Sequence, residues 1–329
     1  MSYRWGIIGC GLIAPKFVQS MEKTGEGRVV AAASKSMRRA KAFQQKTGIA
    51  NVYASYEAML KNEKLDAVYI ATSHNYHYEN AALCKKYGKP VLVEKAFTQT
   101  AHQAEQLIAL AQREKLFLME AMWTRFNPLI IQLRNLLSGG MIGDIEKLNI
   151  AFCVKMNPLS IKMAPWNRMY NPRLAGGALL DLGVYTLAWA RMIFGEPPQT
   201  IRSSCQRAWT GVDKTSEYHF GYSKGQRADL ITSFCQDRPR DALITGTVGH
   251  IRVPSFMHPS KFILSRNGQS DQTITIEPDR INNGAAGFQH EIREVHRCLR
   301  ENLLESPTMP LHETLEIMKT MDTIRAQWR

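Results

Sequence analysis

The chain has 329 residues, a formal net charge of +13, 44% hydrophobic residues and 22% charged residues. This length exceeds the usual limit for one hydrophobic core, and the ordinary composition excludes a disordered or fibrous protein. The Lys and Arg residues are dispersed and no nucleic-acid-binding motif occurs, so we expect a surface that attracts anionic ligands rather than a nucleic-acid partner.

The first segment combines a short apolar strand with a glycine-rich turn and a helix. The strand breaks into Gly9-x-Gly11-x-x-Ala14. Gly9 permits a tight turn, Gly11 permits close approach of a pyrophosphate, and Ala14 permits close packing of helix on strand. The N–H groups and the positive dipole end of the helix attract phosphates. The spacing therefore predicts a dinucleotide site at Gly9, Gly11, Leu12 and Ile13, although an ordinary strand–turn–helix can share it.

The end of the second predicted strand, over residues 28–33, indicates which dinucleotide binds. A carboxylate there would accept hydrogen bonds from the ribose hydroxyls of NAD and repel a 2′-phosphate. This chain instead has Ser34-Lys35-Ser36, followed by two arginines that include Arg39. Hydroxyls and cations at a helix start are typical of a phosphate site. We therefore expect NADP rather than NAD, bound by Ser34, Lys35 and Arg39, and the alternative is a solvated basic helix start.

Strands and helices alternate through the first third of the chain. Further strands are predicted at 66–71, 90–94 and 116–121, and helices at about 37–47, 75–87 and 100–114. This alternation is typical of a doubly wound parallel sheet, whose ligands bind beyond the carboxyl ends of the strands. The residues at the ends of these strands are therefore expected at the cofactor: Thr72, His74, Glu94 and Lys95.

Beyond Trp123 the pattern changes. A helix over about 127–138 and a strand over 145–155 precede a helix that reaches about residue 194. Residues 200–277 form short β-like runs typical of an antiparallel sheet, and helices at about 287–303 and 311–328 follow. We therefore expect two domains, at 1–122 and 123–329. The first is an α/β Rossmann domain and the second is an α+β domain with a mainly antiparallel sheet.

Targeting and cysteine patterns favour a cytoplasmic protein. No apolar stretch is expected to approach the roughly 18 residues that span a bilayer, and the chain begins directly with the first strand, without a signal peptide. The six cysteines are scattered without metal-ligand spacing, which is typical of a reducing compartment. We expect no membrane partner, no metal site and no structural disulfide.

Motifs along the whole chain resemble the Gfo/Idh/MocA oxidoreductase family. They are the glycine turn, Ser34-Lys35-Ser36, Val93-Glu94-Lys95, the segments 118–126 and 176–185, and the tail from Phe288. Within the family the chain is similar to the branch of dimeric dihydrodiol dehydrogenases and NADP-dependent D-xylose dehydrogenases. The resemblance implies an open-faced sheet in the second domain and a homodimer formed through that sheet. Two positions depart from the family pattern, because Ala96 and Ser73 stand where the family usually has proline.

The resemblance also implies which residues carry the chemistry. Family members have a catalytic Lys at the position of Lys95 and a Tyr or His at that of Tyr185. An ammonium can stabilise charge on a reacting oxygen, and a phenol can transfer its proton. Asp181 precedes Tyr185 by one helical turn and could orient either group or bind a substrate hydroxyl. His77 matches a family histidine near the cofactor.

The expected substrate site is aromatic. Trp123, Arg125, Phe152 and Trp166 fall where the resembling branch lines its pocket, and Arg125 could contact the cofactor or pair with Asp181. Aromatic faces suit a sugar or an aromatic diol. We therefore expect an NADP-dependent oxidoreductase acting on a secondary alcohol, hemiacetal or carbonyl of a small polyol, most simply an aldose-like sugar. A trans-dihydrodiol dehydrogenase acting on cyclic aromatic diols and a non-catalytic NADP-binding redox sensor are the alternatives.

Overall fold

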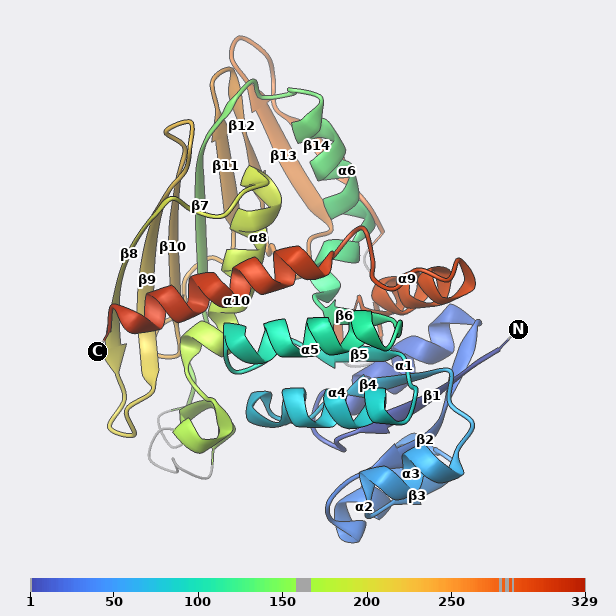
Figure 1. Cartoon of the computed structure of the whole chain (residues 1–329). Helices are drawn as coiled ribbons and strands as arrows, with labels where there is room; N and C mark the ends of the chain where they lie inside the picture. Colours follow the sequence, from blue (N-terminus) through green and yellow to red (C-terminus); the bar gives the residue numbers. More distant parts are fainter. Residues whose placement is uncertain (1, 158–166, 278–279, 282–283, 286, 329) are drawn as a thin grey trace. The chain divides into compact units, whose positions relative to one another are not determined.

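The computed structural model describes the chain in two compact units (Figure 1); it describes residues 2–157, 167–277, 280–281, 284–285 and 287–328. Unit 1 comprises Met1–Phe126 and Asp279–Leu315, and unit 2 comprises Asn127–Pro278 and Glu316–Arg329. These units differ from the two continuous stretches expected from the sequence, because a late segment of the chain folds with the N-terminal part.

Unit 1 is built on a six-stranded parallel sheet with the order β3-β2-β1-β4-β5-β6. The strands are β1 (Tyr3–Ile8), β2 (Gly27–Ala33), β3 (Asn51–Tyr53), β4 (Ala67–Ile70), β5 (Val91–Glu94) and β6 (Leu118–Ala121). Every residue of β4, β5 and β6 is buried. Strands covered on both faces need apolar side chains in both directions, which explains their continuous apolar sequence. The predicted Rossmann-type sheet is confirmed.

Three helices of unit 1 begin at a short polar side chain that caps them. Ser36, Ser55 and Thr100 each accept a hydrogen bond from a backbone N–H in the first turn of the helix that follows. The helices are α1 (Ala14–Thr24), α2 (Met37–Thr47), α3 (Tyr56–Asn62), η1 (His74–Tyr76), α4 (His77–Lys86), α5 (Ala101–Arg113), η2 (Trp123–Phe126) and α9 (Phe288–Arg300). Strand β3 and helix α3 were not expected, because such short elements give too few residues for a period to show.

Helix α9 and the residues around it belong to unit 1 although they come late in the chain. The α9 residue His296 stacks on Tyr3 with ring centroids 4.2 Å apart. Its Nε2 accepts a hydrogen bond of 2.9 Å from the Trp5 indole. Burial lowers the pKa of His296 to about 4, which keeps this acceptor nitrogen unprotonated. Two aromatic residues of β1 thus attach α9 to the first strand of the sheet.

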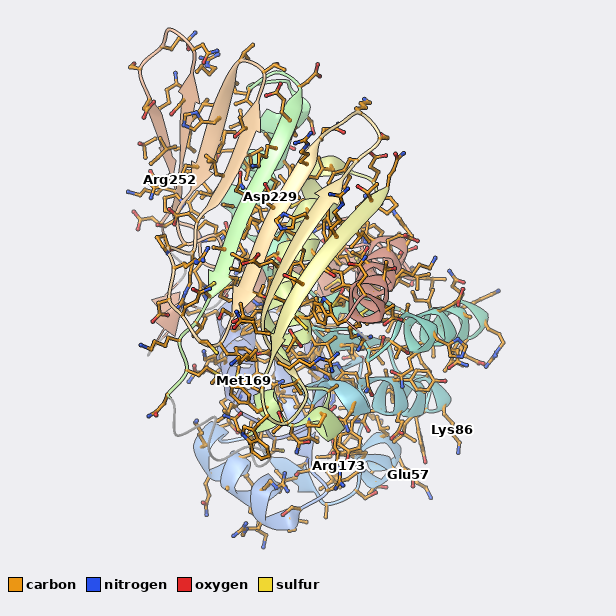
Figure 2. The ribbon with its side chains drawn as sticks, turned by 90° about the vertical axis from the view of Figure 1, so that its left-hand side faces the viewer. Glu57, Lys86, Met169, Arg173, Asp229 and Arg252 are labelled. Atoms are coloured by element: carbon orange, nitrogen blue, oxygen red, sulfur yellow. The ribbon has the colours of Figure 1, made fainter. Side chains whose placement is uncertain are left out.

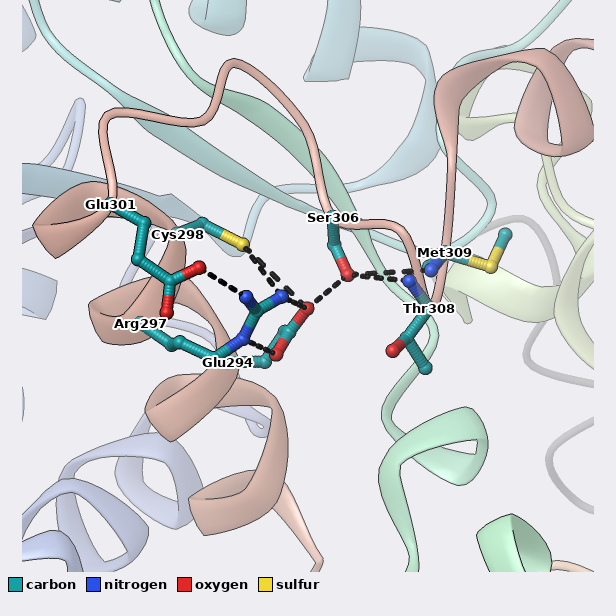
Figure 3. Close-up of polar contacts among 7 residues, drawn as sticks. All are labelled: Glu294, Arg297, Cys298, Glu301, Ser306, Thr308 and Met309. Carbon is teal, nitrogen blue, oxygen red and sulfur yellow. Dashed lines mark hydrogen bonds and ion pairs between the residues drawn. The ribbon is translucent and has the colours of Figure 1, made fainter.

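A polar network joins α9 to the loop that follows it (Figure 3). Arg297 donates from Nε and Nη2 to the two carboxylate oxygens of Glu294, each at 2.9 Å, and from Nη1 to Glu301 at 2.6 Å. The Ser306 hydroxyl donates to the same Glu294 carboxylate at 2.5 Å and accepts from the backbone N–H of Thr308 at 3.0 Å. Bidentate pairing fixes the geometry of both side chains, so the loop is held against the end of α9.

Unit 2 is built on an eight-stranded sheet with the order β14-β13-β12-β11-β7-β10-β9-β8. Its strands are β7 (Ile145–Cys153), β8 (Thr200–Arg207), β9 (Asp213–Gly221), β10 (Arg227–Ser233), β11 (Ala242–Gly246), β12 (Gly249–Val253), β13 (Lys261–Arg266) and β14 (Gln272–Thr275). Only the pair β7 and β10 is parallel among these. The sheet is therefore mainly antiparallel, as expected. A separate two-stranded ribbon, β15 (Arg280–Ile281) and β16 (Gly284–Ala285), belongs to unit 1.

The strands of unit 2 alternate between a buried and an open face. In β12, for example, Ile251 is buried whereas His250 and Arg252 are exposed. The buried face packs on apolar side chains, and Phe256 contacts both Phe152 of β7 and Trp189 of α8. The helices of this unit are α6 (Pro128–Ser138), η3 (Arg168–Tyr170), η4 (Pro172–Leu174), the π-helical turn η5 (Leu179–Gly183) and α8 (Val184–Phe194). Helix α10 (Leu311–Ala326) is divided between the two units.

One expectation about apolar stretches was wrong. Among the described residues, the segment Pro172–Phe194 is long and apolar enough to cross a bilayer by length and composition, with a mean hydropathy of 1.2. Within this segment, 83% of the 18-residue window that meets this test is buried inside the molecule. A helix covering one face of a sheet needs such a composition, because most of its surface faces other side chains.

Candidate active site

The glycine turn of unit 1 is tight, because a side chain at Gly9 would clash with the backbone that follows β4. Its φ is +104°, and a Cβ there would lie 2.7 Å from the carbonyl carbon and oxygen of Ala71 and 2.8 Å from the Thr72 nitrogen. Gly11 leaves its Cβ position 3.6 Å from the Ala71 oxygen. Leu12, at the tip of the turn, is 95% exposed. The turn therefore brings bare backbone beside the end of β4, as a pyrophosphate requires.

Basic side chains lie at the start of α2, beyond the end of β2. Ser34 is buried, and its hydroxyl accepts a hydrogen bond of 3.4 Å from the Ser36 N–H. Lys35 and Arg39 are exposed, and the Lys35 ammonium lies 4.8 Å from the centre of the Tyr76 ring. An exposed ammonium and guanidinium beside a buried hydroxyl form a donor set suited to a phosphate monoester.

The segment after β4 is held by His77 and Asn80. His77 is fully buried, and its Nδ1 and Nε2 lie 2.9 Å from the Ala96 carbonyl and 3.0 Å from the Thr72 carbonyl. Asn80 donates to the Thr72 hydroxyl at 3.1 Å. His74 is also buried, and its ring meets that of His77 edge-on. His77 thus connects the segments after β4 and β5, and its ring nitrogens contact protein carbonyls.

Lys95 directly follows β5 and is partly exposed. Its backbone N–H donates to the Glu94 carboxylate at 3.1 Å, and the Tyr69 hydroxyl of β4 donates to the other oxygen of that carboxylate. The peptide bond between Lys95 and Ala96 is cis. Glu94 is therefore a buried acceptor beneath the strand end, and it fixes the backbone from which the Lys95 side chain extends.

Two further carboxyl groups are buried in unit 1. Glu120 accepts from the Phe97 N–H at 3.1 Å and from the Thr314 hydroxyl at 3.0 Å, and burial raises its pKa to about 7. Neither oxygen of Glu291, on α9, has a hydrogen-bond partner among the described residues. Burial, with a smaller contribution from Glu94, raises the pKa of Glu291 well above its usual range. Glu291 therefore favours its neutral form.

The two expected substrate residues of unit 1 lie in η2. Trp123 is buried and meets Phe288 of α9 edge-on, with ring centroids 5.8 Å apart. Arg125 is 2% exposed, and its Nη2 donates to Glu313 at 2.5 Å. The structure thus gives Arg125 an ion pair with Glu313, whereas the sequence suggested Asp181 or the cofactor as its partner.

The expected residues of unit 2 lie on one helical segment and the adjoining strand. Asp181 is in the π-helical turn η5, and Tyr185 is in the first turn of α8. The Tyr185 ring packs edge-on against Phe152 of β7, at 5.9 Å between centroids. Asp181 accepts from Arg168 Nη2 at 2.9 Å. Trp166 lies outside the described residues.

Tyr69, Arg168 and Glu291 were not anticipated from the sequence. A tyrosine within the apolar strand Ala-Val-Tyr-Ile was a usable signal, because a buried phenol needs a hydrogen-bond partner. Arg168 and Glu291 gave no local signal, because their partners follow from the tertiary fold. Among the described residues, no group of three His, Cys, Asp or Glu side chains is arranged to hold a metal ion.

Unit 1 has the features of the dinucleotide-binding Rossmann class: a doubly wound parallel sheet and a glycine turn after its first strand. The family model described as "Oxidoreductase family, NAD-binding Rossmann fold" matches residues 3–122, and the GFO/IDH/MocA C-terminal domain matches residues 130–252. The chain belongs to the Gfo/Idh/MocA family of oxidoreductases.

Two curated relatives match almost the whole chain. It is 33% identical over 327 residues to trans-1,2-dihydrobenzene-1,2-diol dehydrogenase of Xenopus tropicalis, covering 98% of this chain and 97% of the relative. It is 34% identical over 354 residues to D-xylose 1-dehydrogenase (NADP(+)) of Hypocrea jecorina, covering 97% of this chain and 90% of the relative.

Solved structures share the fold at lower identity. The 3-ketoreductase KijD10 of Actinomadura kijaniata, in complex with NADP and TDP-benzene, has a TM-score of 0.86 at 24% identity, covering 100% of this chain and 98% of that one. Levoglucosan dehydrogenase, in complex with NADH and levoglucosan, has a TM-score of 0.88 at 15% identity, covering 99% and 97%.

Proposed function

We propose that this protein is an NADP-dependent oxidoreductase acting on a secondary alcohol, hemiacetal or carbonyl of a small polyol, with an aldose-like sugar as the preferred substrate. Three features at the carboxyl edge of one parallel sheet carry the proposal. They are the turn at Gly9, the basic start of α2 and Lys95. The curated D-xylose and dihydrodiol dehydrogenases support a substrate that carries hydroxyl groups.

The cofactor residues follow from the fit of unit 1 to a phosphorylated dinucleotide. Gly9, Gly11, Leu12 and Ile13 would hold the pyrophosphate, and Ser34, Lys35 and Arg39 would hold the 2′-phosphate. Thr72, His74, Glu94 and Lys95 would bind the nicotinamide end of the cofactor. His77 contributes by fixing the carbonyls of Thr72 and Ala96, because both of its ring nitrogens already contact protein. The nicotinamide, when bound, supplies the hydride acceptor.

We propose different chemical roles for Lys95 and Tyr185 at the reacting oxygen of the substrate. The Lys95 ammonium donates a hydrogen bond to that oxygen and stabilises the negative charge that develops as the C–H bond breaks. The deprotonated oxygen of Tyr185 accepts the hydroxyl proton while the hydride leaves the carbon, so that a carbonyl remains. Asp181, held by Arg168, orients Tyr185 or binds a neighbouring substrate hydroxyl. The proposed substrate-binding residues among the described ones are Trp123 and Arg125 of unit 1 and Phe152 of unit 2.

Two alternative functions, a trans-diol dehydrogenase and a redox sensor, are distinguished from this proposal by experiment. An aromatic trans-diol would also suit aromatic walls, and the curated relative of Xenopus tropicalis is named for such a substrate. A redox sensor would bind NADP without turning over any substrate. The residue that separates catalysis from sensing is Lys95, because a sensor needs no charge-stabilising group at the end of β5.

The decisive experiment combines cofactor binding with turnover. NADPH fluorescence and the absorbance change with NADP are measured over a panel of aldoses, polyols and cyclic trans-diols, for the wild type and for Lys95→Met. We expect wild-type turnover with aldoses, and a Lys95→Met variant that binds NADPH within a few-fold of the wild type and loses turnover by roughly 10²-fold or more. Exposed Lys61, on α3 away from the strand ends, supplies the matched control Lys61→Met. NADPH binding without turnover on the panel would indicate a sensor.

The open face of the unit 2 sheet supports a homodimer. Paired positions across the strands place Arg202, His219, Asp229, Asn149, Leu243 and Arg252 in one row on that face. Figure 2 shows Asp229 and Arg252 on this side of the sheet. Asp229 is paired with Lys147 and His219, each at 2.7 Å, and the half-buried Ile231 and Leu243 lie near the centre. A second copy would cover these apolar side chains, and charged pairs would surround them.

The oligomeric state is tested by light scattering. We expect a dimer for the wild type and a monomer for Ile231→Asp, whereas Lys61→Asp in unit 1 should remain dimeric. A wild-type monomer at micromolar concentration would refute the dimer. A cytoplasmic location, without membrane or nucleic-acid partners, stays a prediction, and all six cysteines are free thiols in the structure.

A further inference from the structure

The helical segment that carries Asp181 and Tyr185 begins without a cap of its own. Ala178 is the N-cap residue, and no side chain near it in the sequence accepts a hydrogen bond from the first turn. The residue before it, Gly177, has a φ of +118°, a conformation that glycine adopts most readily. A helix start of this kind leaves backbone N–H groups that need an acceptor from elsewhere.

Asp213, at the start of β9, supplies that acceptor. Its Oδ2 accepts from the Leu179 N–H at 2.7 Å and from the Ser216 hydroxyl at 2.9 Å. A Cβ at Gly177 would lie 2.2 Å from Asp213 Oδ1. Glycine at 177 therefore permits the carboxylate to reach the helix start, from a strand 34 positions further along the chain.

The same strand also places a side chain close to the far end of the π-helical turn. The Tyr218 hydroxyl, also on β9, lies 3.1 Å from the position of a Cβ at Gly183, and it shares a hydrogen bond of 2.9 Å with Thr232. Strand β9 thus bonds to the start of η5 and passes close to its end, and Asp181 lies in the middle of that turn. Single π-helical turns are found frequently at functional sites, because they direct side chains that a regular helix would direct elsewhere.

We propose that Asp213 is a positioning residue for the reaction: it anchors η5 and α8 to the sheet, and thereby fixes the directions of Asp181 and Tyr185. Its negative charge at a helix start is also favourable, because the helix dipole is positive there. The inference rests on the proposed role of Tyr185. Without the anchor, the first turn can shift, and a displacement of about 1 Å at a reacting group can lower turnover about 10²-fold.

The test compares three variants with a control that loses a different helix cap in the same unit. Asp213→Ala removes the acceptor, and Asp213→Asn keeps an oxygen that can accept from Leu179. Ser216→Ala removes the hydroxyl that orients the carboxylate. The control is Asn127→Ala, since the Asn127 side chain accepts from the Leu129 N–H of α6 at 2.8 Å.

We expect Asp213→Ala to lower kcat about tenfold or more at a temperature where it is folded, with little change in the dissociation constant for NADPH, which binds unit 1. Asp213→Asn should recover most of kcat, and Ser216→Ala should lose a smaller part. Asn127→Ala should lower Tm comparably and keep its kcat. If Asp213→Ala does not fold, Asp213→Asn and Ser216→Ala decide the question. A full kcat in both variants overturns the proposal, and a lowered kcat in Ser216→Ala supports it.

Tyr185→Phe, measured in parallel, separates the two levels of inference. If this variant keeps full turnover, the proposed role of Tyr185 is wrong and the anchor has nothing to position. If Tyr185→Phe loses turnover while Asp213→Ala keeps the kcat of the Asn127→Ala control, Asp213 has only a structural role and the present proposal is overturned.

Discussion

Arg168 Nη2 and Asp181 Oδ1 form an ion pair of 2.9 Å, in which the carboxylate is the buried partner: the Asp181 side chain is 6% exposed and that of Arg168 is 40% exposed. The pair connects the turn η3 with the π-helical turn η5 within unit 2. A buried carboxylate depends on its partners far more than an exposed one does, so the guanidinium contributes to the direction in which Asp181 points.

Replacing that guanidinium should therefore affect catalysis as well as stability. We expect Arg168→Met to lower kcat about tenfold and the free energy of unfolding by about 1–3 kcal/mol, because a buried acceptor loses a charged donor. Arg168→Lys should be intermediate. The control is Arg173→Met, an exposed arginine close by in the chain (Figure 2). Steady-state kinetics and urea unfolding measure both effects, and equal kcat values for Arg168→Met and Arg173→Met would contradict the prediction.

Gly9→Ala should weaken cofactor binding. A methyl group there would lie 2.7 Å from the Ala71 carbonyl, so the turn must move away from the end of β4. Gly48→Ala is the matched control, because Gly48 also has a positive φ, of +71°, but has no atom within 4 Å of its Cβ position. We expect the dissociation constant for NADPH to rise more than about tenfold for Gly9→Ala, which is a loss of about 1.4 kcal/mol or more of binding free energy. Gly48→Ala should leave this constant unchanged. A fluorescence titration gives both constants.

Ser34→Asp should shift the preference from NADP toward NAD. A carboxylate at the end of β2 can accept hydrogen bonds from ribose hydroxyls and repels a 2′-phosphate. We expect the ratio of kcat/KM for NADP to that for NAD to fall roughly 10- to 100-fold. Ser55→Asp adds the same charge to unit 1 and keeps its function as the cap of α3. If the ratio is unchanged in Ser34→Asp, the 2′-phosphate is bound elsewhere.

Glu120 should make stability depend on pH. Burial raises its pKa from 4.5 to about 7, so between these values the folded protein holds a proton that the unfolded chain has released. The free energy of unfolding attributable to Glu120 therefore falls as pH rises through this window, and it stays low above pH 7. Glu120→Gln should remove this fall, whereas Glu57→Gln, at an exposed position on α3, should not. Urea titrations between pH 5 and 8 compare the slopes, and parallel curves for wild type and Glu120→Gln would refute the prediction.

Much of unit 1 was predictable because its signals are local. The turn at Gly9 and the basic start of α2 are read within a few consecutive residues, and the backbone direction of a parallel strand fixes the edge at which its last residue lies. That is why Lys95 could be assigned to the end of β5 from the sequence. The family resemblance could be recognised for the same reason, since its motifs are short and continuous, and the matching family models confirm it.

The remaining features depend on pairs of residues far apart in the chain. The contact of Asp213 with Leu179, the attachment of α9 to β1 through His296, and the burial of Glu291 all require the folded sheets to exist first. His77 shows the same limit: the sequence placed it near the cofactor, and its position between two carbonyls is set by the neighbouring strand ends. The sequence determined which groups this protein has for its chemistry. Tertiary packing decided which of them are buried and what holds them, because burial and hydrogen-bond partners depend on the three-dimensional neighbours of a residue.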